Sequence, residues 1–300
     1  MKIAVTTPSG HVGSAAADFL LDFGDTIQVK LLARRTERLR GFIQRGAELA
    51  LGPQDDGEFL TRVTRDADVL FWVTPPGYGS DNVRAMQNRF AQAAVRAIHW
   101  NRIGRIVNLS SVGADQSTGV GVVNGLHDVE VALDGVCDNI THLRPGYFFE
   151  NLLWQLELIR SARKISLPLS PTVRYPMIAT RDVGRVAATR LATQDWLGRS
   201  VRELHGPADL SFEEVAEIVS QALGRKISYE ACDRRRARIL MIAQGTSENA
   251  ADGLLELYDA MDSGRLRATQ PRSSETTTST TLAEFVRERI LPLTSEAMAY

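Results

Sequence analysis

The chain has 300 residues, of which 44% are hydrophobic and 24% charged, a composition typical of a globular protein with a buried core. Its formal net charge of −1 gives no overall field that would attract nucleic acid or an acidic membrane. Two cysteines are too few for a disulfide framework, and no apolar run approaches the roughly 20 residues that span a bilayer. The opening residues also lack the features of a signal peptide. We therefore expect a cytoplasmic protein with a small-molecule partner.

Strands and helices are expected to alternate along the first half of the chain. Short apolar runs predict strands, and apolar residues at helical spacing predict helices. The expected strands cover 2–6, 27–33, 47–51, 68–73, 105–110 and 139–144, and the expected helices cover 11–23, about 83–100 and about 126–135. This alternation without hairpin signals favours the α/β class, with a doubly wound parallel sheet and right-handed crossovers.

The pattern changes after Pro145, where helices dominate and strands become short. Ser211 and Glu214 form a capping box that opens a helix, and Gly224 ends it. The other expected elements are helices near 150–163 and 182–193, two helices between 233 and 264, a helix at about 282–291, and strands at 175–179 and 227–231. The polar, β-branched segment 271–281 is expected to be a surface loop.

A turn with two glycines joins the first strand to the first helix. Free N–H groups at the start of a helix bind phosphate. Gly10 would let the backbone approach a pyrophosphate, and Gly13 would let the helix pack closely on the strand. An ordinary tight turn could show the same pattern, but its place between the first strand and a matched second strand favours a dinucleotide site. The expected contacts are Thr6, Thr7, Ser9, Gly10, His11, Val12 and Gly13.

Two arginines follow the second strand. A site that prefers NAD has Asp or Glu about 20 residues beyond the glycines, where it binds the ribose 2′-hydroxyl. Arg34 and Arg35 lie 21 and 22 residues beyond Gly13. A guanidinium group can pair bidentately with a 2′-phosphate. Solvated surface charge is the plainer alternative, but this placement favours NADP(H) over NAD(H).

These features resemble the NmrA-like branch of the atypical short-chain dehydrogenases. The resemblance runs from residue 2 to about 290, and its segments occur in the family's order. They are TTPSGHVG at 6–13, LLARRTERL at 31–39, GAELALGPQDD at 46–56, DVLFWVTPPG at 68–77, NLSSVGAD at 108–115, ITHLRPGYFFEN at 140–151 and HGPADLSFEEVAEIVSQALGRKISY at 205–229. The resemblance implies a dinucleotide-binding Rossmann domain over 1–150. It also implies a smaller α+β substrate-binding lobe over 151–300, with some segments returning to the sheet.

The resemblance also implies roles for residues that follow the strands. Thr74, Pro75 and Pro76 would line the ribose and pyrophosphate, Ser110 would border the nicotinamide, and Pro145 and Tyr147 would close over it. Phe148, Asn151, Trp154 and His127 would face the substrate, although Phe148 and Trp154 could instead be core residues and His127 structural. Two positions depart from the family pattern. Thr7 replaces its first glycine, and Pro53 replaces an Asp near the adenine, so that contact is lost or passes to Gln54.

The usual catalytic pair of short-chain dehydrogenases is missing. Their Tyr-x-x-x-Lys pair passes a proton to a carbonyl, but no tyrosine here has a lysine four residues on. No lysine lies between Lys30 and Lys164, and Asp128 stands near the expected place of the catalytic lysine. The catalytic residue is therefore unknown, and no motif for a metal or for a hydrolase nucleophile is present.

Two functions remain open. The first is an NAD(P)H-dependent oxidoreductase that passes a hydride to a quinone or activated enone, for which correct positioning can replace an acid pair. The second is a non-catalytic dinucleotide sensor that binds a protein partner. The apolar and aromatic stretch 147–154 suits a flat acceptor and favours the enzyme.

Overall fold

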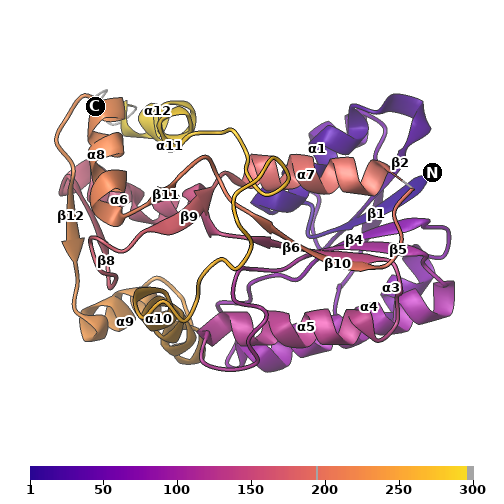
Figure 1. The fold of residues 1–300 in the computed structure, drawn as a ribbon. Helices are drawn as coiled ribbons and strands as arrows, with labels where there is room; N and C mark the ends of the chain where they lie inside the picture. The colour runs from indigo at the N-terminus through magenta and orange to yellow at the C-terminus, as the bar shows by residue number, and fades with distance from the viewer. Residues whose placement is uncertain (194, 296–300) are drawn as a thin grey trace.

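A seven-stranded parallel sheet forms the centre of the molecule in the computed structural model, which describes residues 1–193 and 195–295 (Figure 1). Residues 296–300, the end of the expected second lobe, lie outside the described residues. The strand order is β10-β6-β5-β4-β1-β2-β3. The strands are β1 (Lys2–Thr6), β2 (Gln28–Ala33), β3 (Glu48–Leu51), β4 (Val69–Val73), β5 (Arg105–Leu109), β6 (Ile140–Pro145) and β10 (Arg199–Leu204). The doubly wound α/β fold is thereby confirmed.

Helices cover both faces of the sheet, as Figure 1 shows. The upper face carries α1 (His11–Leu21) and α7 (Thr180–Ala192), and the lower face carries α3 (Gly57–Val63), α4 (Val83–Asn101) and α5 (Asn124–Asp134). Gly184 of α7 lets the two upper helices pack closely, because a Cβ atom there would lie 2.5 Å from Ala15 Cβ. Short helices η1 (Gly24–Thr26), α2 (Arg40–Gln44) and η2 (Gly121–Val123) complete this part.

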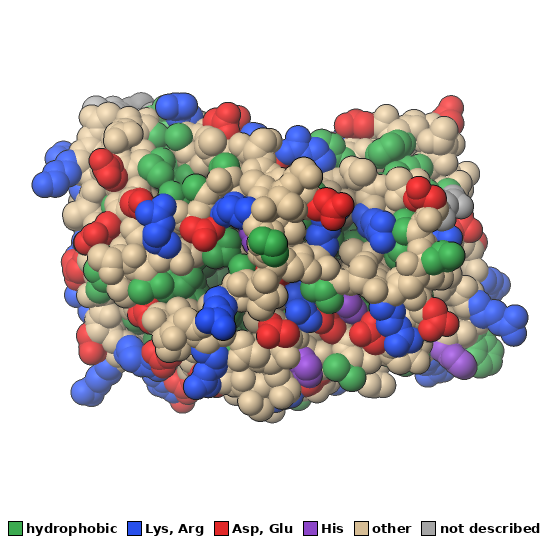
Figure 2. All heavy atoms as spheres, viewed as in Figure 1, with side chains coloured by type: hydrophobic (Ala, Val, Ile, Leu, Met, Phe, Trp, Pro, Cys, Tyr) green, Lys and Arg blue, Asp and Glu red, His purple; other side chains and the backbone are tan. Residues whose placement is uncertain are grey.

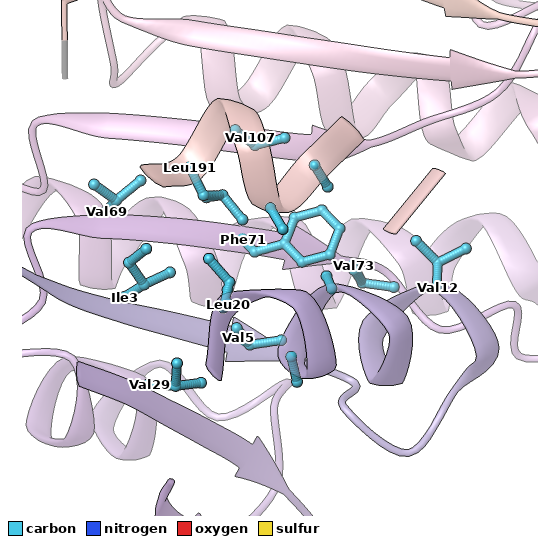
Figure 3. Packing of buried hydrophobic residues seen from close by; sticks show 14 of the residues in the cluster. Ile3, Val5, Val12, Leu20, Val29, Val69, Phe71, Val73, Val107 and Leu191 are labelled. Carbon is cyan, nitrogen blue, oxygen red and sulfur yellow. The ribbon is translucent and has the colours of Figure 1, made fainter. Parts of the chain in front are cut away.

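The core under the upper helices is built from alternate residues of the strands (Figure 3). Ile3, Val5 and Phe71 are fully buried there, and Val12 and Leu20 of α1 close over them. Burial of each such side chain stabilises the fold by roughly 1.5–3 kcal/mol. The intervening residues, such as Trp72 and Ile106, face the lower helices. A sheet buried on both faces explains why the strand segments are almost wholly apolar.

A smaller lobe lies beyond the carboxyl edge of the sheet (Figure 1). Its strands are β7 (Tyr147–Phe148), β8 (Lys164–Leu167), β9 (Tyr175–Ile178), β11 (Asp209–Leu210) and β12 (Ser228–Ala231). Its helices are η3 (Phe149–Gln155), α6 (Leu156–Ser161), α8 (Phe212–Leu223), α9 (Arg234–Ala243), α10 (Glu248–Asp262), α11 (Leu282–Phe285), η4 (Val286–Ile290) and α12 (Leu291–Ser295). The predicted capping box of α8 is confirmed, with Gly224 in the left-handed conformation at its end.

One predicted helix differs from the structure. The helix expected near 150–163 begins as the 3₁₀ helix η3 and becomes α-helical only at Leu156. The segment 271–281 is a largely exposed loop, as expected, and it also runs back along the sheet. His205 N–H donates to the Thr276 carbonyl oxygen at 2.7 Å, and Thr278 N–H donates to the His205 carbonyl oxygen at 2.8 Å. We call residues 269–281 the strap, because they cover the otherwise open edge next to β10.

A buried carboxylate anchors the strap to the sheet. Glu203 is 1% exposed, and it accepts hydrogen bonds from the backbone N–H groups of Thr269 and Gln270, both at 2.8 Å, and from the Thr269 hydroxyl at 2.9 Å. Burial alone would raise the pKa of Glu203, but hydrogen bonds from His205, Gln270 and Thr269 outweigh burial and lower it to about 2. The carboxylate is therefore held in its charged form.

Glu203→Gln is expected to destabilise the protein by about 2–3 kcal/mol at pH 7, because it removes charge-assisted hydrogen bonds to the strap. The stabilisation from a carboxylate with a lowered pKa is present above the unfolded-state pKa and is lost as the pH falls toward the folded-state pKa. The difference between the wild type and Glu203→Gln should thus shrink between about pH 4.5 and 2. Urea unfolding at a series of pH values measures this difference in stability. The control is Glu275→Gln, which changes an exposed residue of the strap. A constant difference would contradict the role of the Glu203 charge.

Candidate functional site

The predicted site residues follow strands whose carboxyl ends meet at the sheet edge facing the smaller lobe (Figure 1). In a doubly wound sheet, ligands bind at this edge, near the point where the strand order reverses. Here β1 lies between β2 and β4, so that point lies beside β1 and the turn that follows it. The glycine turn therefore stands where a dinucleotide would cross the sheet.

The turn between β1 and α1 fits a pyrophosphate. Gly13 is sterically required, because a Cβ atom there would lie 2.3 Å from the Thr7 carbonyl oxygen. The Gly10 N–H donates to the same carbonyl at 3.1 Å and closes the turn. No side chain caps α1, and its first turn holds no acidic residue. The first N–H groups of this helix are thus free to bind an anion.

The remaining turn residues divide into buried and open positions. Thr6 is fully buried, where its hydroxyl donates to the Phe71 carbonyl oxygen at 3.1 Å and accepts from the Val73 N–H at 2.7 Å. Val12 is 4% exposed and its side chain belongs to the core, which leaves only its backbone for a ligand. Ser9 and His11 are exposed. Ser9, Gly10 and His11 are therefore the accessible members of the predicted set.

Thr7 adopts the left-handed conformation, with φ of 50°, which is rare for a β-branched residue. Its hydroxyl lies 2.8 Å from the Val73 carbonyl oxygen, to which it donates, and 3.0 Å from Gln54 Oε1. The Gln54 amide in turn donates to the Leu32 carbonyl oxygen, and Gln54 is buried. These contacts join the ends of β1, β2 and β4 and hold Thr7 where the family has glycine.

Thr7→Val is expected to destabilise the protein by about 1–2 kcal/mol, because it keeps the backbone strain and removes the hydrogen bond to the Val73 carbonyl. In Thr7→Gly the relief of strain should offset much of that loss, so its stability should stay within about 1 kcal/mol of the wild type. Chemical denaturation of the two variants measures this. Equal stabilities would show that the hydroxyl does not hold the turn.

Arg34 and Arg35 lie directly after β2 and are both exposed. Among residues 1–193 and 195–295, neither guanidinium group forms an ion pair or a hydrogen bond. Other arginines of the protein do form ion pairs. Arg45, for example, pairs with Asp18 and Asp22. Two free guanidinium groups beside the open turn therefore suit a ligand phosphate.

The residues after β4 and β5 continue the same edge. Thr74 is half-buried and accepts a hydrogen bond from the Trp72 indole N–H at 3.0 Å, with Pro75 half-buried and Pro76 exposed beside it. Ser110 is 5% exposed, and its hydroxyl has no partner among the described residues. Such an unsatisfied buried hydroxyl fits a ligand hydrogen bond at the predicted nicotinamide end.

Several aromatic side chains lie where the smaller lobe meets the predicted site. We call Tyr78, Tyr147, Trp154 and Tyr258 the aromatic wall. Beyond the buried Pro145, Tyr147 packs edge-on against Phe212 at 5.5 Å. The Trp154 ring meets Tyr78 edge-on at 5.7 Å, and 55% of Trp154 is exposed. Asn151 and Phe148 are half-buried, and Phe148 packs partly against the sheet core. Phe148 thus serves the core as well as the predicted substrate side.

The tyrosine hydroxyl groups of the aromatic wall could donate a proton, but all three are weak acids. Burial raises the pKa of Tyr78 to about 12 and that of Tyr258 well above its ordinary value. Burial also raises the pKa of Tyr147, although a hydrogen bond with Asn151 opposes the rise. Tyr258 and Tyr147 belong to the same hydrophobic cluster. All three phenols remain protonated near neutral pH.

The helix α5 carries Asp128 and His127, and both side chains make contacts with neighbouring elements. Asp128 forms a bidentate pair with Arg84 on α4, at 2.6 and 2.8 Å, and the hydrogen bond from Arg84 lowers the pKa of Asp128. Asp128 therefore ties α5 to α4. His127 is half-buried, with its Nδ1 atom 2.9 Å from the Ala114 carbonyl oxygen in the loop after β5. Within the described residues, no group of His, Cys, Asp or Glu side chains could hold a metal ion.

Sequence patterns did not identify Tyr78 or Tyr258 as part of the aromatic wall. Tyr78 follows Gly77, whose positive φ of 66° turns the chain after β4, and the Tyr78 carbonyl accepts the Ser247 N–H at 2.8 Å at the start of α10. The glycine after the two prolines was a usable signal for Tyr78. Tyr258 lies in the middle of an amphipathic helix, where a core residue and a site residue have the same spacing.

The sequence pattern of the NmrA-like family matches residues 1–285. The chain is 28% identical over 258 residues to the NAD(P)H azoreductase of Xenophilus azovorans, which covers 85% of this chain and 86% of that protein. The fold is similar to that of an NADPH-dependent quinone oxidoreductase from Escherichia coli in complex with NADPH, with 19% identity and a TM-score of 0.79. The match covers 95% of this chain and 99% of that protein. It is also similar to the NADP(H) complex of the Citrobacter sp. triphenylmethane reductase, with 20% identity, a TM-score of 0.76 and coverage of 96% and 99%.

Proposed function

Because the chain belongs to the NmrA-like family, we propose that it is a reductase that takes a hydride from NAD(P)H, prefers NADPH, and passes the hydride to a flat conjugated acceptor. Quinones and activated enones are the acceptor classes that the site favours. The azo and triphenylmethane substrates named for two similar proteins are also extended conjugated systems, which supports this choice.

The proposal rests on one observation: the start of α1 has no side-chain cap, and two arginines without ion pairs follow the neighbouring strand β2. The N–H groups in the first turn of α1, which begins at His11, would hold the pyrophosphate, and Arg34 and Arg35 would hold the 2′-phosphate. The free Ser110 hydroxyl would bind at the nicotinamide end. Pro145 of β6 and Tyr147 of β7 would close over that end, with Thr74, Pro75 and Pro76 along the middle.

The chemistry requires little beyond positioning. When bound, the nicotinamide supplies the hydride. Tyr78, Tyr147 and Trp154 would exclude water and hold the acceptor flat, so that proximity supplies most of the rate increase. Addition of hydride to a quinone or enone leaves an oxyanion stabilised by conjugation, and one proton from solvent completes the reduced product. No strong acid is needed, in agreement with the raised pKa values of the tyrosines.

The proposal is tested by titrating the protein with NADPH, NADP⁺, NADH and NAD⁺, followed by turnover with quinones, enones and azo dyes. We expect tight NADPH binding and NADPH oxidation that depends on the acceptor. Tight NADPH binding without turnover on any acceptor would instead favour the non-catalytic sensor with a protein partner. No binding of any of the four nucleotides would overturn the assignment of the site.

Trp154→Ala is expected to raise the KM for the acceptor by about three- to tenfold, because aromatic pairs contribute roughly 0.5–1.5 kcal/mol. The Kd for NADPH should not change, since Trp154 lies on the side of the smaller lobe. Steady-state kinetics with a quinone measures the effect. Trp100→Ala, at the far end of α4 and 75% exposed, is the matched control. An unchanged KM in Trp154→Ala would remove this side chain from the substrate site.

A further inference from the structure

A cavity lies between the outer face of α1, including His11 beside the predicted pyrophosphate turn, and the helix formed by α11 and η4. Its volume is about 330 Å³, at the lower end of the range of roughly 300–1,000 Å³ for ligand pockets. The first turn of α7 and the short helix α2 complete its walls. The upper outline of the molecule dips at this place, between the two parts of the structure (Figure 2).

A buried carboxylate lines this cavity. Glu150 is only 6% exposed and caps the start of α7, where it accepts the Thr180 N–H at 3.0 Å and the Thr180 hydroxyl at 2.5 Å. A carboxylate can accept about four hydrogen bonds, so part of its capacity remains unused. No cationic side chain of residues 1–193 and 195–295 forms an ion pair with Glu150. A buried charge with no counter-ion costs considerable free energy.

The other charged groups of the lining are already paired or solvated. Arg181 pairs with Glu288 at 2.5 Å, and Asp18 pairs with Arg45. Arg289 is exposed to solvent and forms no ion pair with Glu150. With three carboxylates and two guanidinium groups, the lining carries a formal charge of −1 (−3 + 2). The cavity therefore favours a cation over an anion.

Two phenyl rings supply the apolar part of the cavity. Phe285 is 3% exposed and packs on Phe149 with ring centroids 5.7 Å apart, which fixes its position. Phe42 contributes to the lining from α2. Aromatic rings attract both apolar groups and organic cations. The lining thus combines one buried carboxylate, that of Glu150, with the two phenyl rings of Phe42 and Phe285.

We propose that this cavity binds a small protonated amine with an aromatic or apolar body, whose ammonium group pairs with Glu150 and whose body lies between Phe42 and Phe285. Hydrogen bonds from Thr180 fix the Glu150 carboxylate, so the anion is preorganised for the ligand. The cavity borders the predicted pyrophosphate turn through His11, but its lining includes none of the residues proposed for the nicotinamide and acceptor, so its ligand does not depend on that function.

The test is calorimetric titration of the full chain with phenethylammonium. The matched probes are 2-phenylethanol, which is neutral, and phenylacetate, which is an anion. We expect phenethylammonium to bind at least about tenfold more tightly than either, the difference expected from one charge-assisted hydrogen bond. No binding of the amine, or equal binding of the alcohol, would overturn the proposal.

Two variants locate the binding. Glu150→Gln removes the charge but keeps an acceptor for Thr180, and Ser14→Phe fills the cavity from α1 without touching Glu150. Each should weaken phenethylammonium binding at least about tenfold. Glu157→Gln, an exposed change on the neighbouring α6, should leave the affinity unchanged. If Glu150→Gln does not fold, Ser14→Phe alone decides, and unchanged affinity in Ser14→Phe would overturn the proposal.

Discussion

Gly13→Ala is expected to weaken NADPH binding by at least about 100-fold, the largest effect of any single substitution at the site. The added Cβ atom would lie 2.3 Å from the Thr7 carbonyl oxygen and 3.0 Å from its carbonyl carbon, both part of the backbone. The clash must therefore move either α1 or the turn. A shift of about 1 Å is enough to break the aligned N–H groups that would hold the pyrophosphate.

Fluorescence titration with NADPH measures the effect, and urea unfolding reports the accompanying loss of stability. Gly104→Ala is the matched control, because a Cβ atom there meets nothing within 4 Å. That variant should bind NADPH like the wild type and stay within about 0.5 kcal/mol of its stability. Normal NADPH affinity in Gly13→Ala would place the dinucleotide away from the turn.

The double variant Arg34→Ala with Arg35→Ala is expected to lose about 100-fold or more in affinity for NADPH and little for NADH. Hydrogen bonds between charged groups contribute roughly 1.5–3 kcal/mol each, and only NADPH carries the 2′-phosphate. Both guanidinium groups are exposed and unpaired among the described residues, so their removal breaks no contact within the protein. The folded state should keep its stability.

Parallel titrations with NADPH and NADH separate cofactor preference from general binding. Arg65→Ala is the control, because Arg65 is exposed but precedes β4, at the opposite end of the sheet. The preference should also weaken as salt is added, since the contacts are ionic. An equal loss for NADPH and NADH would mean that the arginines hold a part common to both nucleotides.

Most strands of the sheet could be predicted because they are buried on both faces and so appear as apolar runs. The strand β10 was missed because it lies at the edge of the sheet and its sequence, RSVREL, is mostly polar, without an apolar run or a strict alternation. The strap was expected to be a surface loop because threonine and serine dominate it. The strap is such a loop, but the Thr278 hydroxyl and N–H groups also donate to the His205 carbonyl oxygen directly after β10, a tertiary contact that no local pattern records.

The site shows the same division between local and long-range information. The glycine turn and the two arginines were predicted by spacing along the chain, but spacing does not show how Thr7 is held in the left-handed conformation where the family pattern has glycine. How it is held depends on Gln54 and Val73, which come from other strands. The cofactor and substrate roles of these residues remain predictions that the variants above test.

The order in which the sheet is assembled has a consequence for synthesis on the ribosome. The upper core rests on α7 as well as α1, and both α7 and β10 follow the first segments of the smaller lobe in the chain. When β6 has left the exit tunnel, Val107 and Leu143 still lack the helix that covers them. The nascent chain must therefore carry an exposed apolar surface until α7 emerges, which makes it a substrate for chaperones during that interval.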